Sequence, residues 1–167
     1  MSYGIDDKIV KNAIKSLKNE FGDIKFYEKN VMNGLETPCI FIRVIDSTFK
    51  RLIANRFEAN FTLSATYIPD KKEVMEKSSG DRVIKDNGLA HIQDVKLRLM
   101  SALESIETET GFLYASDISS ETNYDDLGVT INMSCNFQVN YIKISDKYYM
   151  QKLHSEGSVK EWRNKKM

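Results

Sequence analysis

The chain has 167 residues, and its 24 Lys and Arg balance 24 Asp and Glu to give a formal net charge of zero. With 41% hydrophobic and 29% charged residues, it has the composition of one ordinary soluble domain that needs no metal or disulfide to hold a core. Zero net charge argues against a general nucleic-acid coat protein, because phosphate binding needs an excess of Lys and Arg.

Membrane and secretory classes are also disfavoured. No stretch approaches the roughly 20 consecutive apolar residues that span a bilayer. Acids stand at positions 6 and 7, where a signal peptide has a basic and then an apolar stretch. Two cysteines, Cys39 and Cys135, are too few for a disulfide framework. We therefore expect a protein that is made and kept in a cytoplasm, with no membrane partner.

The first half of the chain predicts one helix and three strands. Apolar side chains recur at three- and four-residue spacing over residues 5–21, which predicts a helix, and Gly22 is a natural stop. A short strand is expected at 24–28. The apolar run 40–45 predicts a strand covered on both faces, and strict alternation over 57–67 predicts a strand with one face on a core.

The second half adds a helix and two strands. A helical stripe predicts a helix over 88–106. Residues 112–118 are expected to pair with 127–142 through a turn at 123–128, and alternation over 129–141 supports the last strand. The order helix, three strands, helix, two strands predicts an α+β fold, with a mainly antiparallel sheet and two helices packed on one face.

Two segments do not fit this pattern. Residues 70–87 are charged and poor in core residues, so we predict either a solvated loop or an assembly loop. We assign 146–167 as a basic and aromatic extension of a single domain at 1–145. Its large apolar side chains are candidates for a partner contact, unless this is a frayed end. They are Tyr148, Tyr149, Leu153 and Trp162.

No catalytic, cofactor-binding or metal-binding residue is predicted. The chain has no P-loop, Gly-x-Gly-x-x-Gly or His-Glu-x-x-His motif. Cys39 opens an apolar strand and Cys135 takes an inward position, so both are expected to pack as small hydrophobes. His91 and His154 lack metal-ligand spacing, and the two Asp at 125–126 suit a hairpin turn. An enzyme is the least favoured class.

The polar positions of the last strand are more informative. Over 130–140 the six outward residues are Thr, Asn, Ser or Gln, and none is charged. A freely solvated face normally mixes in Lys and Glu, whereas burying an amide or hydroxyl costs less than burying a charge. We predict that this face contacts another subunit; the alternative is ordinary exposure. The candidate residues are Asn132, Ser134, Asn136 and Gln138.

Several short motifs follow one another in an order that resembles a known family. They are Phe21-Gly22-Asp23, Phe26-Tyr27-Glu28, Val31, Gly34-Leu35, Pro38-Cys39-Ile40-Phe41-Ile42, Arg56-Phe57, Phe61 and Tyr67-Ile68-Pro69. In this order and spacing they resemble the tail terminator proteins of tailed phages and phage-like elements of Firmicutes, which include contractile R-type bacteriocin particles. The resemblance covers most of 5–142. The segments 70–87 and after 145 depart from it.

The resemblance implies a structural protein of a virion or phage-tail-like particle, assembled in the bacterial host cytoplasm. It implies a ring, six-fold by analogy, that caps the head-proximal end of the tail tube, stops tube polymerisation and offers a surface to the neck. The implied partners are further copies of the chain, the tail tube protein and neck, connector or sheath proteins. DNA would pass through the ring lumen without sequence-specific binding. No cofactor is implied.

Two alternatives stay open at this point. One is another neck or tail-tube structural protein of the same particle, which composition does not separate from a terminator. The other is a small nucleic-acid-binding module that uses the basic tail. It is less favoured, because the aromatic and basic residues of the tail are not interleaved on a sheet as in an RNA-recognition surface.

Overall fold

The computed structural model describes residues 4–28, 34–78, 80–85, 87–125, 128–144 and 147–150. Its helices are α1 (Ile5–Phe21), α2 (Lys71–Val74) and α3 (Gly88–Glu104). Its strands are β1 (Lys25–Tyr27), β2 (Cys39–Arg51), β3 (Arg56–Ile68), β4 (Met75–Ser78), β5 (Asp81–Ile84), β6 (Ser105–Thr108), β7 (Gly111–Asp125), β8 (Gly128–Ile144) and β9 (Lys147–Met150). None of the helices described is long and apolar enough to cross a membrane.

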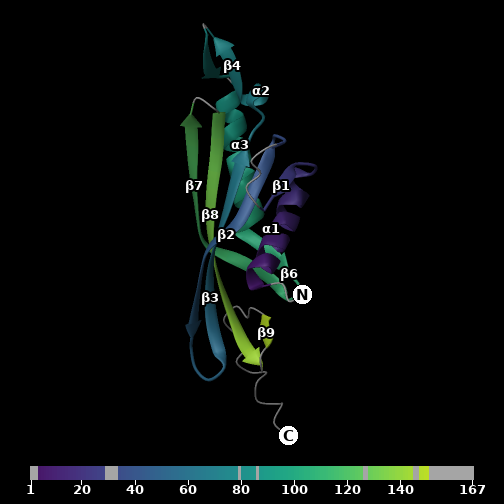
Figure 1. The fold of residues 1–167 in the computed structure, drawn as a ribbon, viewed down its shortest axis with the longest axis vertical. Coiled ribbons are helices and arrows are strands. Elements are labelled where there is room, and N and C mark those ends of the chain that lie inside the picture. Colours follow the sequence, from purple (N-terminus) through teal and green to yellow (C-terminus); the bar gives the residue numbers. More distant parts are fainter. Residues whose placement is uncertain are drawn as a thin grey trace.

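The main sheet has the strand order β1-β2-β3-β8-β7-β6, and β9 also pairs with β8. Strand β1 runs parallel to β2, while every other described pair is antiparallel. Helices α1 and α3 cover one face of this sheet, and the small β4–β5 sheet projects beyond one end (Figure 1). The predicted α+β class with a mainly antiparallel sheet is therefore confirmed.

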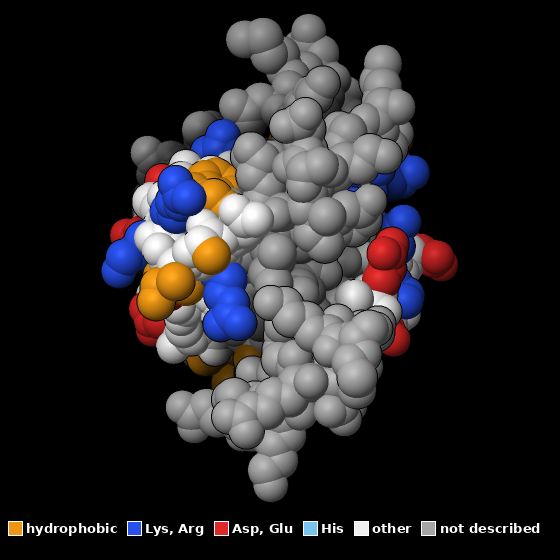
Figure 2. Space-filling view, turned by 90° about the horizontal axis from the view of Figure 1, so that it is seen from below, with side chains coloured by type: hydrophobic (Ala, Val, Ile, Leu, Met, Phe, Trp, Pro, Cys, Tyr) orange, Lys and Arg blue, Asp and Glu red, His pale blue; other side chains and the backbone are white. Residues whose placement is uncertain are grey.

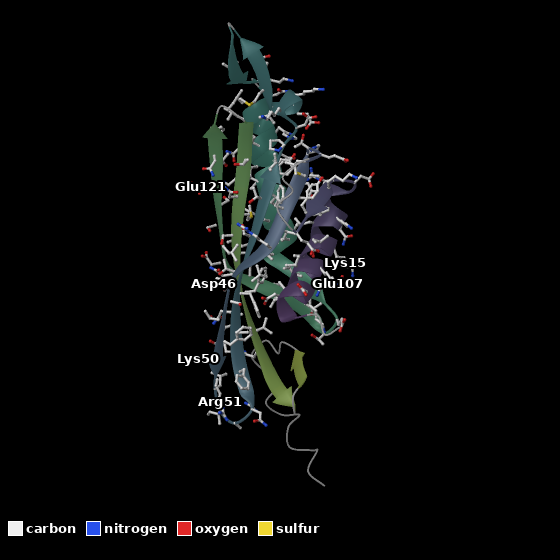
Figure 3. The ribbon with its side chains drawn as sticks, in the orientation of Figure 1. Lys15, Asp46, Lys50, Arg51, Glu107 and Glu121 are labelled. Carbon is white, nitrogen blue, oxygen red and sulfur yellow. The ribbon has the colours of Figure 1, made fainter. Side chains whose placement is uncertain are left out.

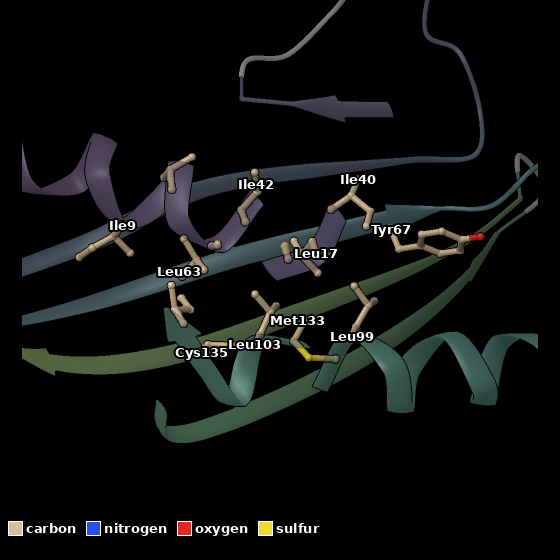
Figure 4. Close-up of a cluster of buried hydrophobic side chains, with 14 of the residues drawn as sticks. Ile9, Leu17, Ile40, Ile42, Leu63, Tyr67, Leu99, Leu103, Met133 and Cys135 are labelled. Carbon is tan, nitrogen blue, oxygen red and sulfur yellow. The ribbon is translucent and has the colours of Figure 1, made fainter. Parts of the chain in front are cut away.

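The core lies between the two helices and the sheet (Figure 4). Alternate residues of β3 and β8, such as Leu63 and Met133, point at the helices and are almost fully buried. They pack in one cluster with Leu17 of α1 and Leu99 of α3. Burying a side chain of this size contributes about 1.5–3 kcal/mol, so the alternation read from the sequence also supplies the main driving force.

The end of α1 is fastened to α3. Gly22 stops the helix in a left-handed conformation with φ 65°, and its N–H donates to the Lys18 carbonyl at 2.9 Å. Arg98 of α3 contacts this end of α1 in two ways. Its Nε donates to Glu20 Oε1 at 2.9 Å, and its guanidinium lies 4.6 Å from the Phe21 ring centroid. The helix predicted over residues 5–21 and its glycine stop are both confirmed.

The helix predicted over 88–106 is α3, and it ends at Glu104, two residues earlier than predicted. Residues 105 and 106 belong to strand β6, because the backbone at Ser105 is already extended with φ −138° and ψ 127°. Ile106 is fully buried there, so it packs into the core as a residue of β6 and not as the last apolar residue of the helix. The β-branched residues of 105–110 favour this conformation, a signal that the helical spacing of Ile106 masked.

The prediction of a loop over 70–87 is wrong, and so is the prediction of two helices, because this segment adds a third one. The segment forms the short helix α2 and the β4–β5 hairpin. Asp70 caps α2 by accepting from the Lys72 N–H at 3.0 Å, and Val74 is buried against α3. A four-residue helix and four-residue strands are too short to show periodicity in a charged sequence.

Strands β2 and β7 extend well past their predicted ends. The lower half of β2 pairs with β3 in a hairpin that projects from the sheet (Figure 1). The upper half of β7 pairs only with β8, so it is an edge, and edges carry polar and charged residues that hide the strand pattern. The predicted pairing of β7 with β8 is confirmed, with Asp125 opposite Gly128; residues 126 and 127 of the predicted turn lie outside the described residues.

Candidate subunit interface

The uncharged positions of β8 lie on the sheet face opposite α1 and α3, beside equivalent positions of β3. Ser134 pairs with Ser64, Asn136 with Thr62, and Asn132 with Thr66 in the antiparallel register. These six residues are here named the polar ladder, with Ser64 and Ser134 at its centre. All six are partly buried, although no described helix covers them.

Hydrogen bonds between side chains tie the ladder together across the strands. The Thr62 hydroxyl donates to Asn136 Oδ1 and the Thr66 hydroxyl donates to Asn132 Oδ1, each at 2.8 Å. Cross-strand pairs of this kind stabilise a sheet by roughly 0.2–1 kcal/mol each. The ladder is therefore a pre-ordered surface, and its hydrogen-bonded side chains lose little further freedom when a partner covers them.

Charged residues border the ladder on both sides. Strand β2 places Arg43 beside Ser64 and Asp46 beside Thr62. Strand β7 places Asp117 beside Asn136 and Glu121 beside Asn132. Figure 3 labels one acid from each bordering strand, Asp46 of β2 and Glu121 of β7. A neutral centre with a charged rim is the usual anatomy of a protein–protein interface.

The sequence-predicted interface residues fall into three groups. Asn132, Ser134 and Asn136 are members of the ladder, and Gln138 continues the same face one step further along β8, where it is exposed. Tyr148 and Tyr149 lie in β9, opposite Lys143 and Ile142 of β8; their side chains are outside the described part. Leu153 and Trp162 lie outside the described residues.

A sequence model of the phage tail terminator protein family matches residues 8–149. The chain belongs to the phage tail terminator family. The family resemblance predicted from the short motifs is thereby confirmed. Comparison with curated protein sequences gives no match.

Membership in the family fixes the general role of the protein. It is a structural component of a phage tail and of the virion, and it interacts with other tail components. A structural family also argues against an enzyme. The residues that make the contacts are not given by the family, so the ladder stays a hypothesis for the subunit surface.

Half of the ladder was missed from the sequence. Residues 60, 62, 64 and 66 are Asn, Thr, Ser and Thr, so the β3 half carries the same absence of charge as β8. The signal was present in the alternating pattern. What the sequence lacks is the information that β3 and β8 are neighbours with Ser64 facing Ser134.

A hollow of about 430 Å³ adjoins the β2 margin of the ladder. Its lining consists of Glu28, Phe41, Ile42, Arg43, Ser64, Thr66 and Ile68. The polar side chains among them are only partly buried or exposed, whereas a small-molecule site holds its few polar groups in a buried cleft. The hollow is better suited to a side chain of a neighbouring protein.

Neither cysteine nor histidine builds a reactive site in the part of the chain that the structure describes. Burial raises the pKa of the Cys39 thiol to about 11 and that of Cys135 to about 12. His91 lies on α3 with Nε2 3.9 Å from Glu73 Oε2 of α2, and His154 is outside the described residues. Within these same limits, no group of three or more His, Cys, Asp or Glu could hold a metal.

Proposed function

We propose that this protein is the tail terminator of its particle: a ring, six-fold by family resemblance, that caps the head-proximal end of the tail tube. The ring stops tube polymerisation and offers its free face to the neck or connector. Its further partners are the tube protein and, in a contractile particle, the sheath. DNA passes through the lumen without sequence-specific contacts.

The family match over residues 8–149 is the observation that carries this proposal. The polar ladder supports the ring part of it. A ring needs each copy to bury a surface against its neighbour. The ladder offers one whose desolvation costs little, because its groups are neutral and four of its six side chains are already hydrogen-bonded to one another.

Tail length tests the terminator role. In cells that make the particle, removal of this protein should give tubes longer than wild type that lack necks, because tube growth is no longer stopped. Loss of a tube protein would give no tubes, and loss of a neck protein would give unjoined tails of normal length. Either of these last two results would replace the terminator role with one of the alternatives.

Substitutions in the ladder test the ring surface. Asn132→Asp with Asn136→Asp keeps the size of both side chains and the acceptors for Thr66 and Thr62 but adds two charges. Asn132→Lys with Asn136→Lys adds the opposite charge beside Glu121 and Asp117. A buried interface rejects both pairs, because each leaves desolvated charge.

The two charge signs also distinguish mechanisms. If only one pair of substitutions blocks assembly, the surface attracts a charged partner and is not a neutral buried contact. The matched control is Asn19→Lys with Gln93→Lys, which adds the same charge to exposed positions of α1 and α3. The control should assemble like wild type, at six times the 19.2 kDa mass of one chain.

A further inference from the structure

The β2–β3 hairpin ends in an exposed tip, defined here as residues 50–54. Ile53 is 82% exposed and Leu52 is 42% exposed, and the two basic residues Lys50 and Arg51 precede them. Arg51 Nε donates to the Ala54 carbonyl at 3.2 Å, so the turn holds its own shape. The tip contains no acid.

These side chains add nothing to the core of the described fold. Two consecutive apolar side chains, Leu52 and Ile53, are exposed at the end of a projecting hairpin, and such a cluster is a surface that a partner can cover. Figure 2 looks at this end of the molecule and shows hydrophobic side chains directly beside Lys and Arg on the side where the hairpin lies in Figure 1. The occupant of this tip should therefore be apolar and acidic.

The same chain carries a surface of that chemistry on the β6–β7 hairpin. Phe112 is 52% and Tyr114 is 66% exposed, with ring centroids 6.3 Å apart. Glu107 lies opposite Phe112 in the register, and exposed Glu109 follows in the turn. These four residues are here named the aromatic–acidic patch. Ile106 and Leu113 of the same strands point into the core, so the patch faces outward.

We propose that the tip of one subunit docks on the aromatic–acidic patch of the next copy in the ring. Lys50 and Arg51 would approach Glu107 and Glu109, and a guanidinium can also stack on an aromatic ring. Ile53 would be covered by the rings of the patch. Each surface also carries one charge of the opposing sign: Lys15 Nζ lies 3.2 Å from Glu107 Oε2, and Glu58 stands opposite Lys50 in the hairpin register.

The positions of the two surfaces suit a ring. Figure 3 shows Lys50 and Arg51 at the lower end of the sheet, and Glu107 beside α1 on the helical side. A contact between two unlike surfaces is head-to-tail, and it forms a closed ring when the rotation between copies closes. The hairpin also carries β3, so a docked tip brings the strand that holds half of the polar ladder towards the neighbouring subunit.

Reversed charges in two separate variants test the pairing. The tip variant is Lys50→Glu with Arg51→Glu, and the patch variant is Glu107→Lys with Glu109→Lys. Each variant alone presents like charges at every contact, so the protein concentration needed for half-assembly should rise at least about tenfold. The melting temperature should fall only slightly, because the substitutions remove two exposed contacts, Arg51 to the Ala54 carbonyl and Glu107 to Lys15, and exposed contacts contribute little to stability.

An equal mixture of the two variants is the decisive sample. Each tip then meets a patch of opposite sign if the variants alternate around the ring, which closes only for an even number of subunits. The mixture should form rings of wild-type mass. When both variants are produced together in cells that make the particle, chemical cross-linking of the tails should again join neighbouring copies of this protein. A variant that assembles normally alone would overturn the pairing, and so would a mixture that fails.

The apolar part of the contact has its own variant. Ile53→Ser should also raise the half-assembly concentration at least about fivefold, because losing a well-covered side chain of this size weakens a contact by more than about 1 kcal/mol. The control is Leu97→Ser, which removes a 65% exposed apolar side chain from α3 and should assemble normally. Equal effects of the two substitutions would contradict a specific role for the tip.

This inference rests on the proposed ring, but the two can fail separately. Rings restored by mixing, in particles whose tail length does not depend on this protein, would keep the contact and remove the terminator role. Tail length that depends on this protein, with assembly insensitive to both charge reversals, would keep the role and remove the contact.

Discussion

Cys39 and Cys135 are packing residues whose chemistry is suppressed by their surroundings. Both side chains are fully buried, and desolvation holds the pKa of each thiol at about 11 and about 12 respectively, against an ordinary value of 9.0. The Tyr67 hydroxyl shows the same effect, because burial raises its pKa from 10.0 to about 12. A thiolate is needed for nucleophilic attack, so neither cysteine can serve as a nucleophile near neutral pH.

Stability should therefore fall on the alkaline side. Below pH 9 both thiols are protonated in the folded and unfolded chains, and their contribution is fully present. Above that pH the unfolded thiols ionise while the buried ones keep their protons, so the free energy of unfolding falls towards a limit of about 1.4 kcal/mol per pH unit for each thiol. Urea unfolding at pH 8, 9 and 10 measures this slope.

Replacement of both thiols provides the control. Cys39→Ala with Cys135→Ala should cost on the order of 1 kcal/mol per site at pH 8 through lost packing, yet flatten the decline between pH 9 and 10. Assembly into particles should be unaffected once the protein is folded. An unchanged alkaline slope would mean that groups other than these thiols cause it, and lost assembly of a folded variant would give the cysteines a role we deny.

Ala54 is the one non-glycine residue with positive φ in the described part of the chain, at 56°. Left-handed backbone costs an alanine roughly 1 kcal/mol relative to glycine. Ala54→Gly should accordingly raise the free energy of unfolding by up to about 1 kcal/mol. Ala90→Gly, in an exposed helical position of α3, should lower it by a similar amount. The same sign at both sites would mean that the turn is not strained.

At the scale of elements, Gly88 decides how the projecting β4–β5 unit joins the body. It begins α3, and a Cβ added there would stand 2.7 Å from the Val74 carbonyl oxygen and 2.9 Å from Ile84 Cγ2. Its N–H donates to the Lys85 carbonyl at 2.8 Å, and the Lys85 N–H donates to the carbonyl of Val74 at 2.9 Å. Helix α2, β5 and α3 thus meet at a point where only glycine fits.

Gly88→Ala should loosen this junction and leave the main sheet intact. Overpacking of this kind costs about 1–3 kcal/mol, and amide exchange should rise in residues 71–84 before it rises in β3 or β8. Gly4→Ala is the control, because its new Cβ meets nothing within 4 Å, and a change below about 1 kcal/mol is expected at that helix start. Uniformly faster exchange would show that the junction supports the whole fold.

Sequence patterns predicted the elements whose hydrophobic period is long and regular. Helix α1 and strands β3 and β8 were placed to within about two residues, because each keeps one face on the core over many residues. The lower half of β2 and the upper half of β7 were missed, since projecting and edge strands bury one face poorly and lose the period. Helix α2 and strands β4 and β5 were missed because each has only four residues, which is too short for a hydrophobic period to show.

The candidate interface was predictable only in part. Absence of charge over 130–140 pointed to the β8 half of the ladder, but its partner strand came from the sheet order, a long-range property. The tip lies beyond the predicted end of β2. The acids of the patch lie between the predicted helix 88–106 and the predicted strand 112–118, in a segment to which no element was assigned, whereas Phe112 and Tyr114 lie in that predicted strand. Their opposite charges and their exposed apolar side chains become visible as matching surfaces only when both hairpins are in place.

At the scale of the whole molecule, charge is balanced in total but not in position. Basic residues gather at the hairpin tip and in 143–167, whereas acids line the β7 margin and the β6–β7 turn. A zero net charge arranged in this way favours contacts between unlike ends of identical chains. The distribution agrees with a self-assembling tail component.

We propose that the C-terminal extension, residues 146–167, is an assembly arm. Strand β9 pairs Lys147–Met150 with the end of β8, so cutting the chain after position 150 preserves all the described strands, while cutting after 145 removes β9. The first truncation should leave the melting temperature nearly unchanged yet give tails that are not joined to their neck, because Trp162 and Leu153 would be missing from a partner contact. The second should also destabilise the end of β8. Normal particles from the first truncation would show that 151–167 is dispensable, and a lost fold would place the domain boundary beyond residue 150.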